Sequence, residues 1–191
     1  MNASEMTPAR KREPALKVIE RFRSRITPGM YLTTVTRLLS RVPEEILTGL
    51  ESVVLTDNHV RDYRNDTNRP NVQNAPALGY YHLQTPQRQA WVEIFIDRII
   101  SSFPTPVLHI QLVRELLIAK PLFHEIAHHR NAAVGGLRPG SGETLADQWA
   151  LEMSRSYFRR RYWYIRPLSA PLSRFLRFIG AFRKSRLNRG V

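Results

Sequence analysis

Short apolar runs between turn-forming residues predict three strands in the middle of the chain. Residues 52–56 read Ser-Val-Val-Leu-Thr, and two more β-rich runs cover residues 78–83 and 90–96. Only Gln-Thr-Pro-Gln-Arg and its neighbours separate the last two runs, so we expect them to pair as an antiparallel hairpin. Pro43, followed by two glutamates, predicts a short helix that ends by Leu50. The Asn- and Pro-rich stretch after the first strand predicts a loop.

The spacing of apolar residues becomes helical beyond residue 107. Residues 107–119 carry apolar side chains three and four positions apart, and Pro121 then either starts the next helix or kinks a continuous one. Residues 142–152 predict a second amphipathic helix after a connection rich in glycine. Four apolar residues that follow the proline are expected to pack inward: Leu122, Phe123, Ile126 and Ala127.

The first of these helices carries two histidines four residues apart, in the run His124-Glu125-Ile126-Ala127-His128. On a helix, residues four apart lie on adjacent turns of one face, so both imidazoles can bind one ion. Glu125 lies about 100° around the axis from His124, where it can reach a metal-bound water without binding the metal. The motif therefore predicts a zinc site with Glu125 as the general base.

A catalytic zinc commonly has three protein ligands and a fourth position for water, so the two histidines need one partner. Glu143 and Asp147 share one face of the second helix. If Glu143 binds zinc, Asp147 lies one turn further on and can accept a hydrogen bond from a ligand histidine, which fixes the ring's tautomer and orientation. We therefore expect His124, His128 and Glu143 to hold Zn²⁺, with Asp147 in support.

Together, His124-Glu125-x-x-His128 and Glu143-x-x-x-Asp147 resemble the signature of the gluzincin metallopeptidases, and the form Glu-x-x-Ala-Asp resembles their compact ImmA/IrrE type. The resemblance covers roughly residues 44–153, and only the two helical motifs are specific. It implies an α+β, zincin-like minimal catalytic domain, in which a small, mostly antiparallel sheet packs against the motif helix and a second ligand-bearing helix. It also implies a zinc metalloendopeptidase whose polypeptide substrate binds in extended form along a sheet edge.

Other polar residues are weaker candidates for a role in catalysis. His129 could stabilise an oxyanion, but it lies about 100° around the helix from His128, which favours a surface or capping role. Three isolated histidines are expected to be structural: His59, His82 and His109. A tetrahedral oxyanion needs a donor besides the metal. The sequence does not choose among four candidates: Tyr80, His82, Arg155 and Tyr157.

The composition allows one hydrophobic core. The chain has 191 residues, of which 42% are hydrophobic, and this length favours one domain with extensions. It has no cysteine, so nitrogen and oxygen atoms must hold any metal. We find neither an apolar leader nor an uncharged apolar run of about 18 residues, so we expect a cytoplasmic protein without a membrane span.

The net charge of +13 is concentrated at the two ends. Residues 1–41 carry nine Lys and Arg against three Asp and Glu, residues 42–152 carry nine against thirteen, and residues 153–191 carry eleven against none. This asymmetry predicts a basic N-terminal arm over residues 1–41, a zincin-like domain over residues 42–158 and a basic amphipathic C-terminal extension over residues 159–191.

The C-terminal extension indicates a partner. A helix over residues 172–184 would place five apolar residues on one face: Leu172, Phe175, Leu176, Ile179 and Phe182. Such a face either packs on the core or lies on an anionic membrane, which would make the protein peripheral there, and nucleic-acid binding is less favoured. The alternative to a peptidase is therefore a basic membrane- or nucleic-acid-binding protein with a structural or vestigial zinc site.

Overall fold

The computed structural model describes residues 16–23, 29–57, 77–101, 103–134 and 141–164. Within these ranges, four strands form one sheet in the order β1-β2-β4-β3, and six helices accompany it. The elements are β1 (Lys17–Arg21), α1 (Met30–Leu39), α2 (Glu44–Leu47), β2 (Leu50–Thr56), β3 (Gly79–His82), β4 (Ala90–Phe95), α3 (Ile96–Ile100), α4 (Thr105–Leu108), α5 (Gln111–Val134) and α6 (Ser141–Arg161). The fold is α+β, as the sequence predicts.

Most strand pairs of the sheet are parallel. β2 pairs in parallel with β1 on one side and with β4 on the other, and only β3 runs antiparallel to β4. The predicted hairpin is confirmed, but the prediction of a mostly antiparallel sheet is wrong. The hairpin follows from a short connection that is visible in the sequence. The parallel pairs join strands across long crossovers, which leave no local signal.

β1 and α1 belong to the same sheet and core as the rest of the fold. Val35 and Leu38 of α1 are fully buried. The carboxylate of Glu20 accepts hydrogen bonds from the backbone N–H groups of Gly29 (2.7 Å) and Leu32 (2.9 Å), at the start of α1, where a negative charge is favourable. The folded unit therefore starts before residue 42, although charge counting assigns this segment to a basic arm.

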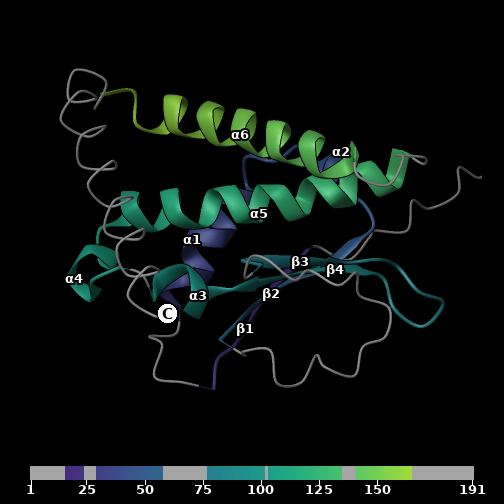
Figure 1. Cartoon of the computed structure of the whole chain (residues 1–191), viewed down its shortest axis with the longest axis horizontal. Coiled ribbons are helices and arrows are strands. Elements are labelled where there is room, and N and C mark those ends of the chain that lie inside the picture. The colour runs from purple at the N-terminus through teal and green to yellow at the C-terminus, as the bar shows by residue number, and fades with distance from the viewer. Residues whose placement is uncertain (1–15, 24–28, 58–76, 102, 135–140, 165–191) are drawn as a thin grey trace, which may run out of the picture.

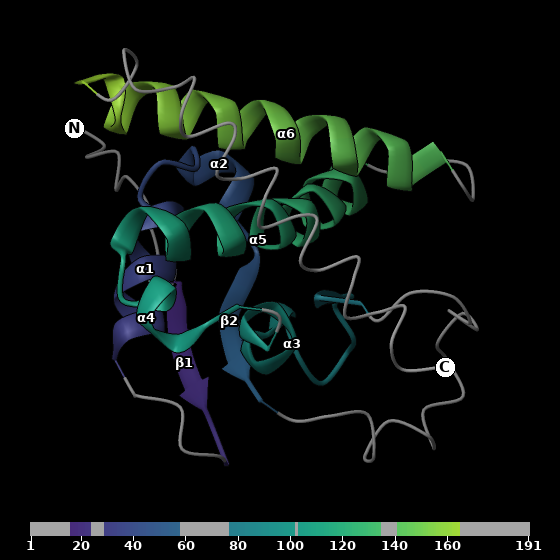
Figure 2. The ribbon, with the colours of Figure 1, turned by 60° about the vertical axis from the view of Figure 1, so that its left-hand side comes forward.

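α5 and α6 form two layers on one face of the sheet (Figure 1). α5 lies against the sheet, and α6 runs along the side of α5 that faces away from it (Figure 1). Figure 2, from another side, shows the same order of layers, with α1 beside α5. The core contains fully buried side chains from β2, β4 and α5: Val53, Leu55, Val92, Ile94, Leu122, Phe123, Ile126 and Ala127. The predicted inward packing of the four α5 residues is therefore confirmed.

α5 continues through Pro121 without a break. Pro121 is buried and lacks the N–H that would bond to the carbonyl of Leu117. The proline therefore does not start a new helix, and the metal motif lies within one 24-residue helix. Among the described helices, none is long and apolar enough to cross a membrane.

Candidate metal centre

α5 presents both motif histidines from adjacent turns, on the side that faces α6. The Nε2 atoms of His124 and His128 lie 3.1 Å apart, and the two side chains are 19% and 24% exposed. Two ring nitrogens at this distance cannot both direct a hydrogen at the other, so at least one of them offers a lone pair. The apolar residues of the same turns are buried in the core and hold the rotation of α5 about its axis.

Glu143 reaches the two histidines from the first turn of α6. Its Oε2 lies 3.2 Å from His124 Nε2, and its Oε1 lies 3.4 Å from His128 Nε2. Ligand atoms that surround one tetrahedral zinc at its usual bond lengths are about 3.3–3.4 Å apart. The three separations are close to that spacing, and the donors form a His-His-Glu group that could hold a metal ion. The fold thus brings together the three residues that the sequence singles out as ligands.

Asp147 contacts the far side of the His124 ring. Its Oδ1 lies 3.3 Å from His124 Nδ1 and 3.3 Å from the Nζ atom of Lys120. A hydrogen on Nδ1, donated to Asp147, leaves the Nε2 of His124 as the lone-pair donor toward His128 and Glu143. Asp147 therefore lies where the sequence predicts it, within reach of the ring nitrogen of His124 that faces away from His128. Lys120 is a member of this group that sequence reasoning missed, although its position one turn before His124 could have indicated it.

The surroundings of His128 favour its neutral form, which is the form that binds metals. Burial lowers the pKa of His128, and the neighbouring His124 adds to this effect. The charges of Glu143 and Asp147 act in the opposite direction but do not prevent a net lowering. A neutral ring at ordinary pH keeps the Nε2 lone pair of His128 available.

Glu125 is buried beside the two histidines and is 8% exposed. The pKa of the Glu125 carboxyl is raised from 4.5 to about 8. Burial is the largest cause, and the negative charge of Glu143 also raises the pKa. A hydrogen bond from the backbone of Tyr81 acts against both effects. Glu125 is thus a carboxyl that binds and releases a proton near neutral pH, which is the property of a general base or acid.

Strand β3 lies against Glu125 at close range. A Cβ atom at Gly79 would lie 2.8 Å from Glu125 Cγ, 3.0 Å from the backbone oxygen of Glu93 and 3.0 Å from Ile94 Cδ1. Two of these neighbours are packed side chains and the third is backbone, so a larger residue at position 79 must displace the strand or the carboxyl. Gly79 was not visible as a functional residue in the sequence, because the contact joins elements that are distant along the chain.

A second contact ties the same strand to α5. The ring of His129 accepts or donates hydrogen bonds at both nitrogens: Nδ1 lies 3.2 Å from Tyr81 Oη, and Nε2 lies 2.9 Å from the carbonyl oxygen of Thr48. The carbonyl can only accept, so Nε2 carries the hydrogen, and in the neutral ring Nδ1 accepts from the Tyr81 hydroxyl. His129 is 5% exposed and is therefore a buried structural residue, not the surface or capping histidine that the sequence favours.

The four candidates for an oxyanion donor are not brought to the His-His-Glu group that could hold a metal ion. At 1.5 Å per residue, Arg155 and Tyr157 lie about 18–21 Å along α6 from Glu143. Tyr80 and His82 alternate with Tyr81 along β3, so their side chains leave the opposite face of the sheet. His82 stacks on Trp91 there, with ring centroids 3.6 Å apart.

The two remaining histidines are also not part of the group. His109 is exposed and follows the short helix α4. His59 lies outside the described residues.

Comparison of the chain with protein-family models, with curated proteins and with solved structures finds no match. Its function therefore has to be argued from the site itself.

Proposed function

We propose that this protein is a zinc-dependent metalloendopeptidase. The observation that carries the proposal is the convergence of three donor atoms from His124, His128 and Glu143, at separations of 3.1 to 3.4 Å, with a buried carboxyl of raised pKa beside them. A structural zinc site has four protein ligands, whereas three described donors plus an adjacent acid are the arrangement of a hydrolytic site. The resemblance to compact gluzincins supports the same reading.

Each residue has a distinct role in this proposal. The donors His124, His128 and Glu143 would hold the ion, and Asp147 would keep the His124 ring in the tautomer that binds it. When bound, zinc supplies a Lewis acid for the scissile carbonyl and lowers the pKa of a water to about 7. Glu125 takes the proton of the attacking water and passes it to the leaving amine. A cation beside Glu143 also offsets the negative charge that raises the pKa of Glu125, so the base ionises more readily.

The substrate in this proposal is a polypeptide in extended conformation along β3. β3 is the last strand of the sheet on the side of Glu125, and Tyr81 of β3 already hydrogen-bonds Glu125 through its backbone. A peptide that adds to this edge would place its backbone beside the catalytic carboxyl. The distance between substrate and base is then set by the packing of β3 on α5 at Gly79 and Tyr81.

The test measures metal content and hydrolysis separately. Full-length protein and the variants His128→Ala, Glu143→Gln and Glu125→Gln are assayed for bound zinc and for cleavage of a peptide library by mass spectrometry. We expect zinc binding to be lost in the first two variants, and to be retained without cleavage in Glu125→Gln. The matched control is Glu152→Gln, an exposed acid further along α6, which should keep both properties.

Two outcomes would contradict the proposal. Full zinc stoichiometry in His128→Ala would remove that histidine from the ligand set. Cleavage by Glu125→Gln at the wild-type rate would exclude Glu125 as the base. A wild type that binds no zinc at micromolar concentration would rule out the whole site.

A further inference from the structure

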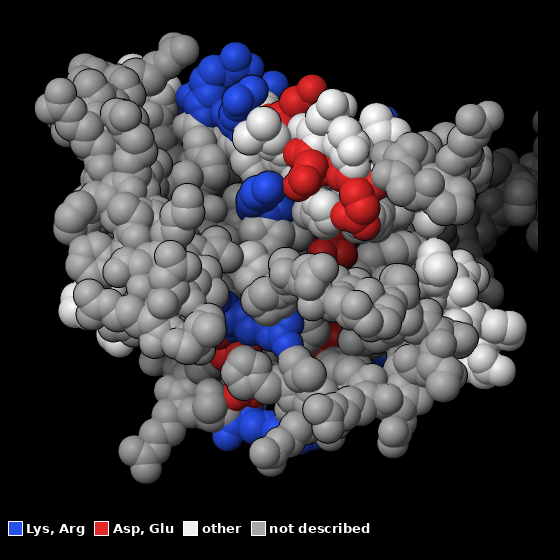
Figure 3. Space-filling view, viewed as in Figure 1, with Lys and Arg blue, Asp and Glu red and all other residues white. Residues whose placement is uncertain are grey.

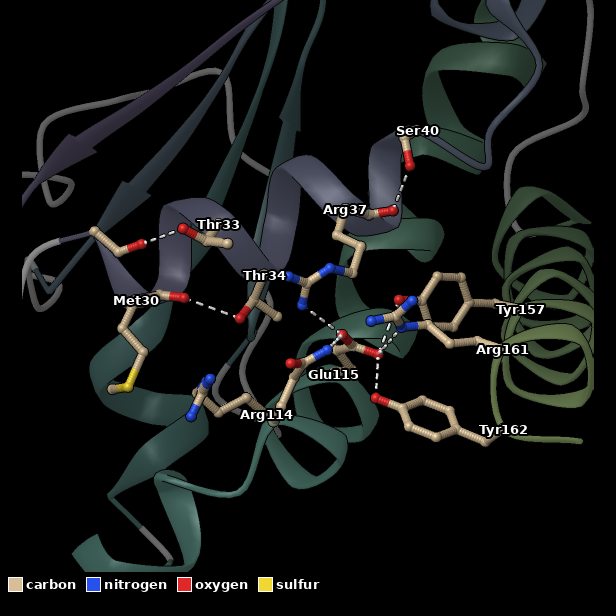
Figure 4. A network of polar contacts seen from close by, with 12 residues as sticks. Met30, Thr33, Thr34, Arg37, Ser40, Arg114, Glu115, Tyr157, Arg161 and Tyr162 are labelled. Atoms are coloured by element: carbon tan, nitrogen blue, oxygen red, sulfur yellow. Dashed lines mark hydrogen bonds and ion pairs between the residues drawn. The ribbon is translucent and has the colours of Figure 1, made fainter. Parts of the chain in front are cut away.

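The C-terminal end of α6 is held to the rest of the fold by a buried carboxylate. Glu115 of α5 is fully buried, and its Oε2 accepts hydrogen bonds from the hydroxyls of Tyr157 and Tyr162, both at 2.8 Å. Arg37 of α1 donates to Oε1 at 3.0 Å, and the Nε of Arg161 lies 3.6 Å from Oε2. Figure 4 shows Arg37 of α1 and the groups at the end of α6 converging on Glu115 of α5. The contacts fix which side of the α6 end faces inward.

The opposite side of this helix end carries exposed arginines, and two exposed aromatic residues follow the last turn of α6. Arg155 and Arg159 lie roughly 160–200° around the axis from Tyr157, so the contacts of Glu115 turn them outward. We call the following five exposed residues the Arg-Trp surface: Arg155, Arg159, Arg160, Trp163 and Tyr164. Trp163 is 67% exposed and Tyr164 is 59% exposed, the first being the most exposed large apolar side chain among the described residues.

Charge changes sign along α6 and stays positive after it. The acids of α6, Glu143, Asp147 and Glu152, all precede residue 153, and the charged residues from Arg155 to the end of the helix are all basic. Residues 165–191 then add seven Lys and Arg and no Asp or Glu. Figure 3 shows blue side chains over the C-terminal half of α6 and red ones further along the same helix.

Helix stability alone explains only part of this pattern. Arginines in the last turn interact favourably with the helix dipole, and this effect does not need aromatic residues. Exposing an indole and a phenol at 67% and 59% has no benefit for folding, because most of their apolar surface stays in water. The combination of arginine with exposed Trp and Tyr therefore indicates a surface for a partner.

We propose that the Arg-Trp surface binds an anionic lipid bilayer. Its arginines match the lipid phosphates and carboxylates, and Trp and Tyr are the residues that favour the depth of the headgroups. The sequence that follows supports lipid over nucleic acid, since residues 172–184 repeat apolar side chains at helical spacing among basic ones. Nucleic acid would engage the charges but would leave this apolar stripe without a partner.

The geometry also sets how the protein would sit on the bilayer. Glu143 lies 12 to 17 residues before the three arginines, which is about 18–26 Å along α6. This distance exceeds the Debye length of about 8 Å at physiological salt, so the charge of Glu143 is largely screened from the Arg-Trp surface and does not neutralise it. Lipid bound at these arginines would therefore lie about 18–26 Å along α6 from Glu143.

The experiment is co-sedimentation of the full chain with vesicles of phosphatidylcholine alone and with 30% phosphatidylserine, in 150 mM salt. We expect binding only to the second kind, with a blue shift of tryptophan fluorescence that is lost in Trp163→Phe. Each surface charge near anionic lipid changes partitioning about fivefold, so Arg155→Gln, Arg159→Gln and Arg160→Gln together should weaken it by at least tenfold. All three changes leave the contacts of Glu115 intact.

The matched control removes the same charge elsewhere: Lys17→Gln, Arg21→Gln and Arg41→Gln, which are exposed cations on or beside other elements. It should bind the vesicles within about twofold of the wild type. Equal weakening of both triple variants would show that net charge alone drives binding and would overturn the proposal. Three other results would also overturn the proposal: failure of the wild type to bind phosphatidylserine vesicles, binding of the Arg triple variant to them like that of the wild type, or tighter binding of the protein to an oligonucleotide than to the vesicles at the same salt. None of these readouts depends on metal or on hydrolysis.

Discussion

Gly79 of β3 and Glu125 of α5 are packed so closely that a Cβ atom at residue 79 would lie 2.8 Å from Glu125 Cγ. The strand proposed to bind substrate and the proposed base are thus in direct contact, and the absence of one side chain allows it. Several properties of the site depend on this close approach.

Gly79→Ala should destabilise the protein by about 1–3 kcal/mol, because the added methyl group overpacks a site bounded by backbone and by Ile94. It should also lower peptide cleavage, since β3 or Glu125 must move. Urea unfolding and the cleavage assay measure the two effects. Gly142→Ala is the control: nothing lies within 4 Å of its added Cβ, so stability should stay the same or rise slightly. Unchanged unfolding of Gly79→Ala would contradict the packing.

Removal of the Asp147 carboxylate should weaken zinc binding by about 10- to 100-fold, because the His124 ring loses the acceptor that fixes its tautomer. Competition with a zinc-binding dye measures the affinity of Asp147→Ala. Lys120→Gln removes the other contact of Asp147 and should change the affinity far less, since the contact with His124 remains. An equal loss in both variants would show that Asp147 acts through Lys120.

The metal-free protein should lose stability as the pH rises from about 4.5 to 8. Burial raises the pKa of Glu125 from 4.5 to about 8, so the folded state binds a proton that the unfolded state has released. This stabilising contribution is fully present below pH 4.5 and is lost as the pH rises through 8, at most about 5 kcal/mol in total. Urea unfolding with a chelator, at pH 5.5 and 8.5, should show a smaller pH dependence for Glu125→Gln than for the wild type. Glu44→Gln, at an exposed acid, should behave like the wild type.

Glu115→Gln should destabilise the fold by about 2–4 kcal/mol at pH 7, because the partners of the buried carboxylate lose their charged acceptor. Burial opposes ionisation of Glu115, but hydrogen bonds from Gln111, Tyr157, Tyr162 and Arg37 outweigh it and hold its pKa below the ordinary value. Glu115 therefore contributes stability at neutral pH that is lost as the pH falls through its folded-state pKa. The gap in melting temperature between wild type and variant should narrow on acidification. A constant gap would contradict an ionised Glu115.

The packing of β3 on α5 should depend on the hydrogen bonds of the His129 ring. Tyr81→Phe removes the hydrogen bond between β3 and α5, which should cost about 1 kcal/mol and speed amide exchange in β3. His129→Asn removes this bond and the bond to Thr48, so it should cost more. Zinc content should stay unchanged, since neither residue belongs to the ligand group. Loss of zinc in His129→Asn would show instead that this histidine supports the metal.

The sequence by itself predicts the metal-ligand group, the hairpin of β3 and β4, and the buried face of α5. These features follow from local rules: residues four apart share a helix face, a short turn joins antiparallel strands, and apolar residues at helical spacing enter the core. His124, Glu125 and His128 are close because they share one helix, and Glu143 joins them because α6 folds back along α5.

Tertiary structure decided the rest. The parallel pairing of β1, β2 and β4 depends on crossovers, and strand periodicity does not record which partner a strand chooses. The need for glycine at Gly79, the burial of His129 between Tyr81 and Thr48, and the convergence on Glu115 all join residues far apart in the chain. Such contacts carry no local pattern, because they are selected by the packing of whole elements. The sequence therefore determines which side chains can act together, and the packing of β3 and α6 on α5 determines the distances at which they meet.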